Sequence, residues 1–194
     1  MNINEKKHSN TTWLYNPFLF LGGAKVFWIG FLIIIIHIPI GYFFNVRFDG
    51  AIDMHLVPSV DSYLIPVLDV AIAWVSMFLC LYVSALIFQS PIRLIDIAGA
   101  TGVARIPLLI SIIPAKIFEP NIQEVEDVLN LQGSELYLLI VGGFVVLLFF
   151  IWFMILLFNA FKVNSNLKRW RLWVGFILSV IIAEIISLVA LAYV

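Results

Sequence analysis

Charged residues are scarce in this chain of 194 amino acids. Asp, Glu, Lys and Arg together make up 12% of the sequence, whereas 63% of the residues are hydrophobic. A soluble domain carries about 25% charged residues, so the composition excludes a soluble globular domain and a disordered chain. The formal net charge of −1 leaves no basic excess for binding a nucleic acid. With a mean hydropathy of +1.08, the chain is typical of an integral membrane protein built of helices.

Motifs for catalysis and for metal binding are also absent from the sequence. No histidine pair has zinc-ligand spacing, no glycine-rich loop would hold a phosphate, and no nucleophile is paired with a base. Asp49, Asp53 and His55 have side chains that metals accept, but their spacing matches no motif, and we interpret them as solvated loop residues. We therefore expect no enzyme, no cofactor and no resident metal.

Five apolar segments are candidates for crossing a membrane, which takes about 20 residues of helix. They cover residues 26–44, 62–88, 98–118, 136–161 and 172–194. The third is interrupted by Arg105, and the 13 residues 106–118 that follow are too short to cross alone. None of the segments alternates with a period of two, as a barrel strand would. The sequence predicts an all-α fold, a polytopic bundle with five transmembrane helices.

The distribution of positive charge supports five crossings, because Lys and Arg collect on the cytoplasmic side of a membrane. Five spans and a cytoplasmic N-terminus place nine of the eleven Lys and Arg residues inside, whereas four spans place six inside and five outside. We therefore expect the N-terminus in the cytoplasm and the C-terminus outside. Residues 1–15 form a cytoplasmic tail in this interpretation, and residues 16–194 form the membrane domain.

Four ionisable side chains lie within the predicted spans, where a charge is costly and marks a functional candidate by default. They are His37, Asp69, Arg105 and Glu184. One interpretation is an intramembrane site that relays a proton or binds a cation. The other, which we favour, is interhelical pairing such as Arg105 with Glu184.

Two further segments carry candidate contacts. Ala98 and Gly102 form a pair of small residues that lets helices approach closely, and Pro107 can kink the helix after Arg105. The linker between the last two spans is basic and carries Lys162, Lys168, Arg169 and Arg171. These cations are candidates for contacting lipid head groups or a cytoplasmic partner, although topological anchoring explains them and is the interpretation we favour.

Several of these features occur together in one known family. Asn16-Pro17 precedes the first span, the arginine-flanked segment 93–105 leads into Pro107-Leu108-Leu109, and a short basic linker joins the two final spans. In this pattern residues 16–194 resemble the Yip domain family of five-span membrane proteins, in the form found in bacteria. The resemblance implies a fold rather than an assigned activity. Eukaryotic members resemble membrane-organising factors that bind small GTPases, but the short tail of this chain argues against a GTPase role.

We therefore expect a non-catalytic scaffold or organising factor that acts through helix and lipid contacts. Its expected partners are the lipid bilayer and other membrane proteins or further copies of itself, and its expected location is the bacterial inner membrane. The alternative is a small ion-coupled transporter that uses His37, Asp69 and Glu184.

Overall fold

The computed structural model describes residues 10–119 and 133–193 of the chain. Five helical spans in it are long and apolar enough to cross a membrane, with α4 and α5 counted as one broken span. This confirms the predicted all-α fold and the number of spans. The elements are α1 Asn10–Tyr15, the 3-10 turn η1 Pro17–Leu19, α2 Gly23–Phe43, β1 Val46–Arg47, β2 His55–Leu56, α3 Leu64–Ile87, α4 Leu94–Ala104, α5 Ile106–Ile117, α7 Ser134–Ser165 and α8 Arg169–Leu191.

The third span begins earlier than predicted and is broken at the predicted kink. It starts at Leu94 rather than at residue 98, and α4 ends where Arg105 caps it. The next helix, α5, has Pro107 in its first turn. Proline is tolerated there because the first N–H groups of a helix have no partner within the helix. The break therefore falls at Arg105, two residues before the proline that disfavours continuing the preceding helix.

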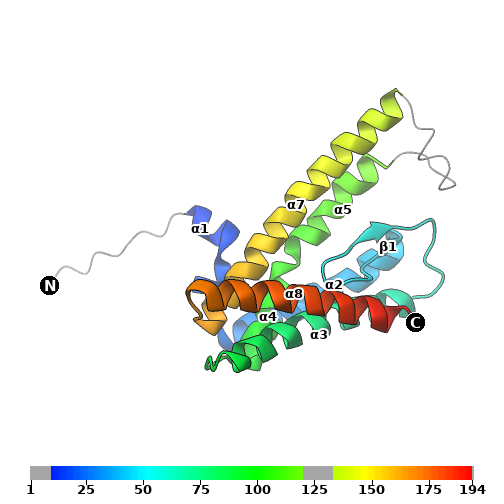
Figure 1. The fold of residues 1–194 in the computed structure, drawn as a ribbon. Coiled ribbons are helices and arrows are strands. Elements are labelled where there is room, and N and C mark those ends of the chain that lie inside the picture. Colours follow the sequence, from blue (N-terminus) through cyan, green and yellow to red (C-terminus); the bar gives the residue numbers. More distant parts are fainter. Residues whose placement is uncertain (1–9, 120–132, 194) are drawn as a thin grey trace.

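The helices form two groups with an opening between them. Figure 1 shows α5 and α7 running together away from the group of α2, α3 and α8, and the β1–β2 hairpin lying in the opening. The broken α4–α5 span is the most buried of the five. In its most apolar stretch 72% of the residues are buried inside the protein, compared with 11% in α7. The chain thus packs its most polar span centrally and exposes its most apolar one.

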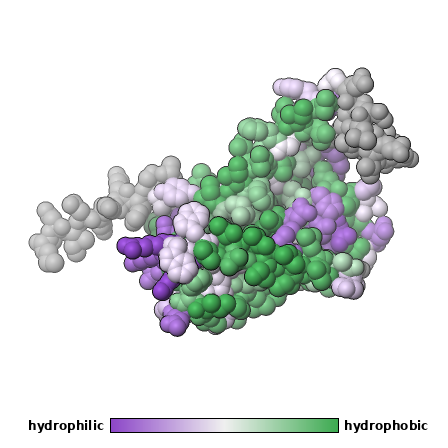
Figure 2. Space-filling view, viewed as in Figure 1, coloured by the Kyte–Doolittle hydropathy of each residue, from purple (hydrophilic) through white to green (hydrophobic). Residues whose placement is uncertain are grey.

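The surface follows the same division. Figure 2 shows hydrophobic residues covering most of the visible helical face, with hydrophilic residues gathered at its left end and over the hairpin.

The short helix α1 lies against α7, where Trp152 Nε1 donates to Leu14 O at 2.8 Å and Asn159 Nδ2 donates to Tyr15 O at 2.9 Å. The described part of the predicted tail is therefore folded onto the membrane domain.

Glycines allow α2 and α4 to touch through their backbones. A Cβ atom on Gly30 would lie 2.1 Å from the carbonyl oxygen of Gly99, and one on Gly102 would lie 2.6 Å from the carbonyl oxygen of Gly30. These distances are shorter than any real Cβ contact, so only glycine fits at the crossing. Gly102 is thus used inside the protein, and the small-residue stretch joins two helices of the same chain.

We expect Gly99→Ala to destabilise the protein by about 1–3 kcal/mol, the usual cost of overpacking. The added Cβ would lie 2.5 Å from the backbone nitrogen of Phe27, so the two helices must separate. The matched control is Gly143→Ala on α7, where a Cβ meets nothing within 4 Å. The control should be neutral or gain up to about 1 kcal/mol, because alanine is the better helix former. Unfolding of the purified protein by SDS titration measures both changes, and equal effects at the two positions would contradict the packing argument.

Five crossings place the two ends of the chain on opposite sides of the membrane. We expect a reporter enzyme that is active only in the cytoplasm to work when fused before Met1 and to fail when fused after Val194. A reporter that is active only outside should behave in the opposite way. If both fusions report the same side, the α4–α5 span does not cross.

Candidate functional site

The hairpin between α2 and α3 enters the helix bundle. Its two short strands are antiparallel, with Val46 opposite Leu56 and Arg47 opposite His55. The side chains of Val46, Phe48 and Ala51 are fully buried. Asp49, Asp53 and His55, interpreted from the sequence as solvated loop residues, therefore lie in a segment that also carries buried apolar side chains, while Asp53 and His55 themselves are exposed. The alternation of apolar Val46 and Phe48 with polar Arg47 and Asp49 was the available signal, but it is too short to separate a buried strand from a loop.

The base of the hairpin is held by an ion pair with α3. Arg47 Nε donates to Asp69 Oδ2 at 2.6 Å and Arg47 Nη2 donates to Asp69 Oδ1 at 2.9 Å, a bidentate arrangement. Asp69 is fully buried, whereas the side chain of Arg47 is 28% exposed. The hydrogen bonds to Asp69 raise the pKa of Arg47 further above its ordinary value. The predicted site residue Asp69 thus has a partner that sequence reasoning did not name.

The tip of the hairpin is held by α8. Ile52 N donates to Glu184 Oε2 at 2.9 Å, and Ala51 N donates to Ser187 Oγ at 2.8 Å. A Cβ atom on Gly50 would lie 2.5 Å from Glu184 Oε1 and 2.7 Å from Asp53 Cβ, so a side chain there would displace the carboxylate that binds the tip. Since Glu184 lies seven residues before the end of α8, the tip reaches about 10 Å below that end at 1.5 Å per residue.

Arg105 reaches the same tip from the break between α4 and α5. Its side chain is 1% exposed, and its Nη2 donates to Ala51 O at 2.8 Å. This carbonyl belongs to the peptide unit whose N–H is bonded to Glu184. Among the described residues no ion pair within 4 Å joins Arg105 to Glu184 directly. One peptide unit instead connects them, with its carbonyl toward the cation and its N–H toward the carboxylate.

His37 lies on the other side of the hairpin. It is fully buried, its Nδ1 is 2.8 Å from Ile33 O one helical turn away, and its ring centroid is 4.9 Å from that of Phe48. Its Nε2 atom and the Nη1 atom of Arg105 are buried without a hydrogen-bond partner. The four ionisable residues named from the sequence are thus arranged around the hairpin, and each is hydrogen-bonded to the hairpin or to its own helix.

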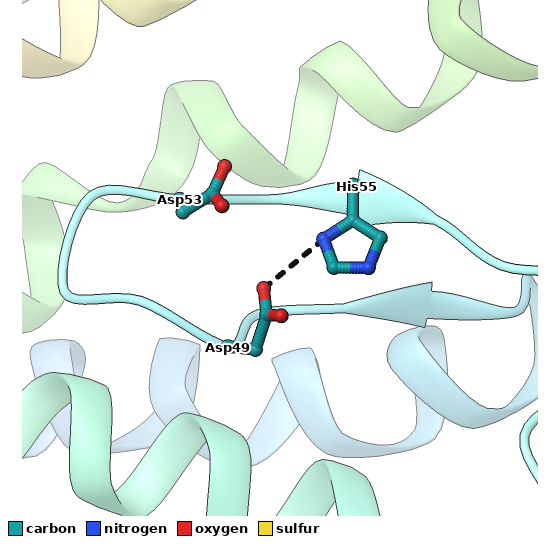
Figure 3. Close-up of side chains that lie close together, drawn as sticks. All are labelled: Asp49, Asp53 and His55. Carbon is teal, nitrogen blue, oxygen red and sulfur yellow. Dashed lines mark ion pairs between the residues drawn. The ribbon is translucent and has the colours of Figure 1, made fainter. Parts of the chain in front are cut away.

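Three potential metal ligands meet near the hairpin tip. Figure 3 shows Asp49 and His55 facing each other across the two strands, with Asp53 beside them. One ligand atom from each residue lies within 4.8 Å of the others, and Asp49 Oδ1 is 3.1 Å from His55 Nδ1. The interpretation as separate solvated residues missed this proximity. The ion pair of Asp49 with His55 accounts for it, and Asp53 and His55 are exposed, so we assign no metal to the three residues.

The other candidate residues are divided between the interior and the surface. Ala98 O accepts a hydrogen bond from Trp74 Nε1 at 3.0 Å, which joins α4 to α3. The four cations of the basic linker are exposed: Lys162, Lys168, Arg169 and Arg171. Lys162 lies in the last turn of α7. Lys168 is the N-cap residue of α8, and Arg169 and Arg171 lie in the first turn of that helix.

These features define a multi-pass helical membrane protein with a hairpin bound inside its bundle. Comparisons of the chain with protein-family models, with curated proteins and with solved structures found no match. The resemblance to the Yip domain family therefore stays a prediction.

We expect Arg105→Met to destabilise the protein by about 1–3 kcal/mol, because it removes the hydrogen bond to Ala51 O and the cation nearest the half-buried carboxylate of Glu184. The double variant Arg105→Met/Glu184→Gln removes both charges and should recover part of that loss. The control Lys116→Met breaks an exposed pair with Glu119 at 2.9 Å and should cost at most about 1 kcal/mol. SDS titration of the purified variants measures all three. A loss from Arg105→Met no larger than that of the control would contradict the role of Arg105.

Proposed function

We propose that this chain is a non-catalytic membrane scaffold or organising factor that acts through helix and lipid contacts. The observation that supports the proposal is the use of the ionisable groups within the spans. Asp69 binds Arg47 of the hairpin, Glu184 binds the backbone of its tip, and Arg105 binds the same tip. Groups that hold the protein's own backbone in place are structural, which leaves the outer helix faces for function.

The helix α7, the least buried of the five spans, offers one such face. It has 32 residues, and its large apolar side chains are exposed along its length: Leu136, Tyr137, Leu138, Ile140, Phe144, Leu147, Leu148, Ile151 and Ile155. In a membrane this face contacts lipid or a second membrane protein. Among the described residues, the other side is covered by α5 and, in part, by α4, α8 and the N-terminal segment.

The resemblance to the Yip domain family adds to this proposal. The small-residue segment that carries the resemblance is the one through which α4 packs against α2 at Gly30. A scaffold of this kind in a bacterial inner membrane needs no cofactor and no small-molecule substrate. Its partners are lipids and either other membrane proteins or further copies of this chain.

One observation favours the alternative, an ion-coupled transporter. Among the described residues, His37 Nε2 and Arg105 Nη1 are buried and have no hydrogen-bond partner, so water entering the bundle would find polar groups to bind. Against it, two cavities of the described structure lie elsewhere. One separates the hairpin from α5 and α7, the other lies between α3 and α8, and neither is lined by His37, Asp69 or Glu184.

Flux and crosslinking measurements separate the two functions. We expect vesicles containing the purified protein to show no proton or alkali-cation flux above that of empty vesicles. A photoreactive amino acid in place of Phe144 on the exposed face of α7 should give discrete protein adducts in native membranes. The same amino acid in place of the buried Phe153 is the control and should give none.

The two functions predict opposite results for one variant. A flux that Glu184→Gln abolishes, in a protein that still folds, would overturn the scaffold and establish the transporter. Absence of flux together with absence of Phe144 adducts would leave no partner protein for the α7 face and would overturn a scaffold that assembles proteins.

A further inference from the structure

An apolar groove runs between α3 and α8 on the outside of the bundle. It has a volume of about 410 Å³, within the range of roughly 300–1,000 Å³ that small-molecule sites occupy. Residues of both helices line it, among them Leu79, Val83, Phe88, Gly175, Ile182 and Ile186. Because both helices are membrane spans, the groove opens toward the lipid.

The few hydroxyl groups of this groove are already hydrogen-bonded. Ser84 Oγ donates to Gly175 O at 3.1 Å, and Ser179 Oγ lies 2.6 Å from the same carbonyl and 3.1 Å from Cys80 O. Side chains that are satisfied by backbone carbonyls offer little to a polar ligand. The groove is therefore suited to a hydrocarbon chain.

The length of the groove matches one leaflet of a bilayer. Its lining on α8 extends from Gly175 to Ile186, eleven steps along the helix, which is about 16 Å. Half of a hydrocarbon core of about 30 Å is about 15 Å. On α3 the lining extends from Leu79 to Phe88, which is about 14 Å. The groove thus begins at the Phe88 end of α3 and is about as long as one leaflet is deep.

A basic turn lies at the end where the groove begins. The ring of Phe88, in the groove, contacts the ring of Trp170 edge-on with centroids 5.8 Å apart. Trp170 belongs to residues 166–171, the connection from α7 into the first turn of α8, which we call the basic turn. These residues line a second hollow of about 410 Å³. The turn carries three cations, Lys168, Arg169 and Arg171, and none of them forms an ion pair with an acidic group in residues 10–119 and 133–193.

We propose that the groove and the basic turn together bind one anionic phospholipid. The phosphate lies against Lys168, Arg169 and Arg171, and one acyl chain fills the groove between α3 and α8. Charge complementarity selects an anionic head group, because three unpaired cations at a membrane interface attract negative lipids. The apolar groove selects a lipid over a free phosphate ion. This inference rests on the proposed function, since it names a lipid through which the scaffold acts.

Native mass spectrometry of the full-length protein in mild detergent tests the proposal. We expect dioleoyl phosphatidylglycerol to bind with one lipid per chain, and dioleoyl phosphatidylcholine and inorganic phosphate to bind far more weakly. The variant Lys168→Gln/Arg171→Gln should weaken phosphatidylglycerol binding about thirtyfold, since each cation contributes about fivefold. Val83→Trp places a large ring in the groove and should reduce the occupancy at the same lipid concentration at least tenfold.

Matched controls carry the same changes elsewhere. Lys25→Gln/Lys116→Gln removes two cations from α2 and α5 instead of from the turn, and Ile151→Trp adds a ring on α7, where Ile151 is about as exposed as Val83 is on α3. Both should leave lipid binding unchanged. Equal binding of the two phospholipids, or losses in the controls as large as those in the test variants, would overturn the proposal. So would a protein dimer formed through the groove that phosphatidylglycerol does not dissociate. None of these results depends on flux or on the Phe144 adducts, so the lipid site and the proposed function can fail separately.

Discussion

One peptide unit, between Ala51 and Ile52, connects a fully buried cation with a half-buried carboxylate inside the helix bundle. Its carbonyl accepts from Arg105 and its N–H donates to Glu184. Each charge thereby meets the end of the peptide dipole that stabilises it, without a direct contact between the two side chains. Removing the hairpin would leave a buried guanidinium and a carboxylate in an apolar interior, which costs several kcal/mol per ion. The packing of α4, α5 and α8 around the hairpin depends on these two hydrogen bonds.

Non-helical backbone at membrane depth is tolerated only where protein surrounds it. The hairpin satisfies this condition, because Val46, Phe48 and Ala51 have no exposed surface and Arg47 is paired with Asp69. Its presence explains why α5 and α7 diverge from α2, α3 and α8 in Figure 1. The divergence leaves α7 covered on one side only, and the apolar α7 face is a consequence of the polar interior.

Much of the fold could be predicted from the sequence, and the partners of the polar residues could not. Apolar length and the distribution of Lys and Arg gave the number of spans, and Pro107 gave the position of the break. The same reasoning identified Asp69 and Glu184 as residues with a special role. It could not identify Arg47, because an arginine in a loop is common. It could not identify the peptide unit at Ala51 either, because every residue has a backbone N–H and C=O and the sequence does not distinguish one from another. The polar residues Asp49, Asp53 and His55 made the segment look like a solvated loop, so the burial of Phe48 and Ala51 was not predicted.

The positions of the hairpin's partners along the chain bear on how the protein is assembled during synthesis. Arg47 and Asp69 are 22 residues apart and can pair as soon as α3 has been made. Ala51 and Ser187 are 136 residues apart, and Ser187 lies in the last helix. The base of the hairpin can therefore form while α3 enters the membrane, and its tip stays without its α8 partners until α8 is inserted. The helix α8 then closes the bundle around a hairpin that was made much earlier.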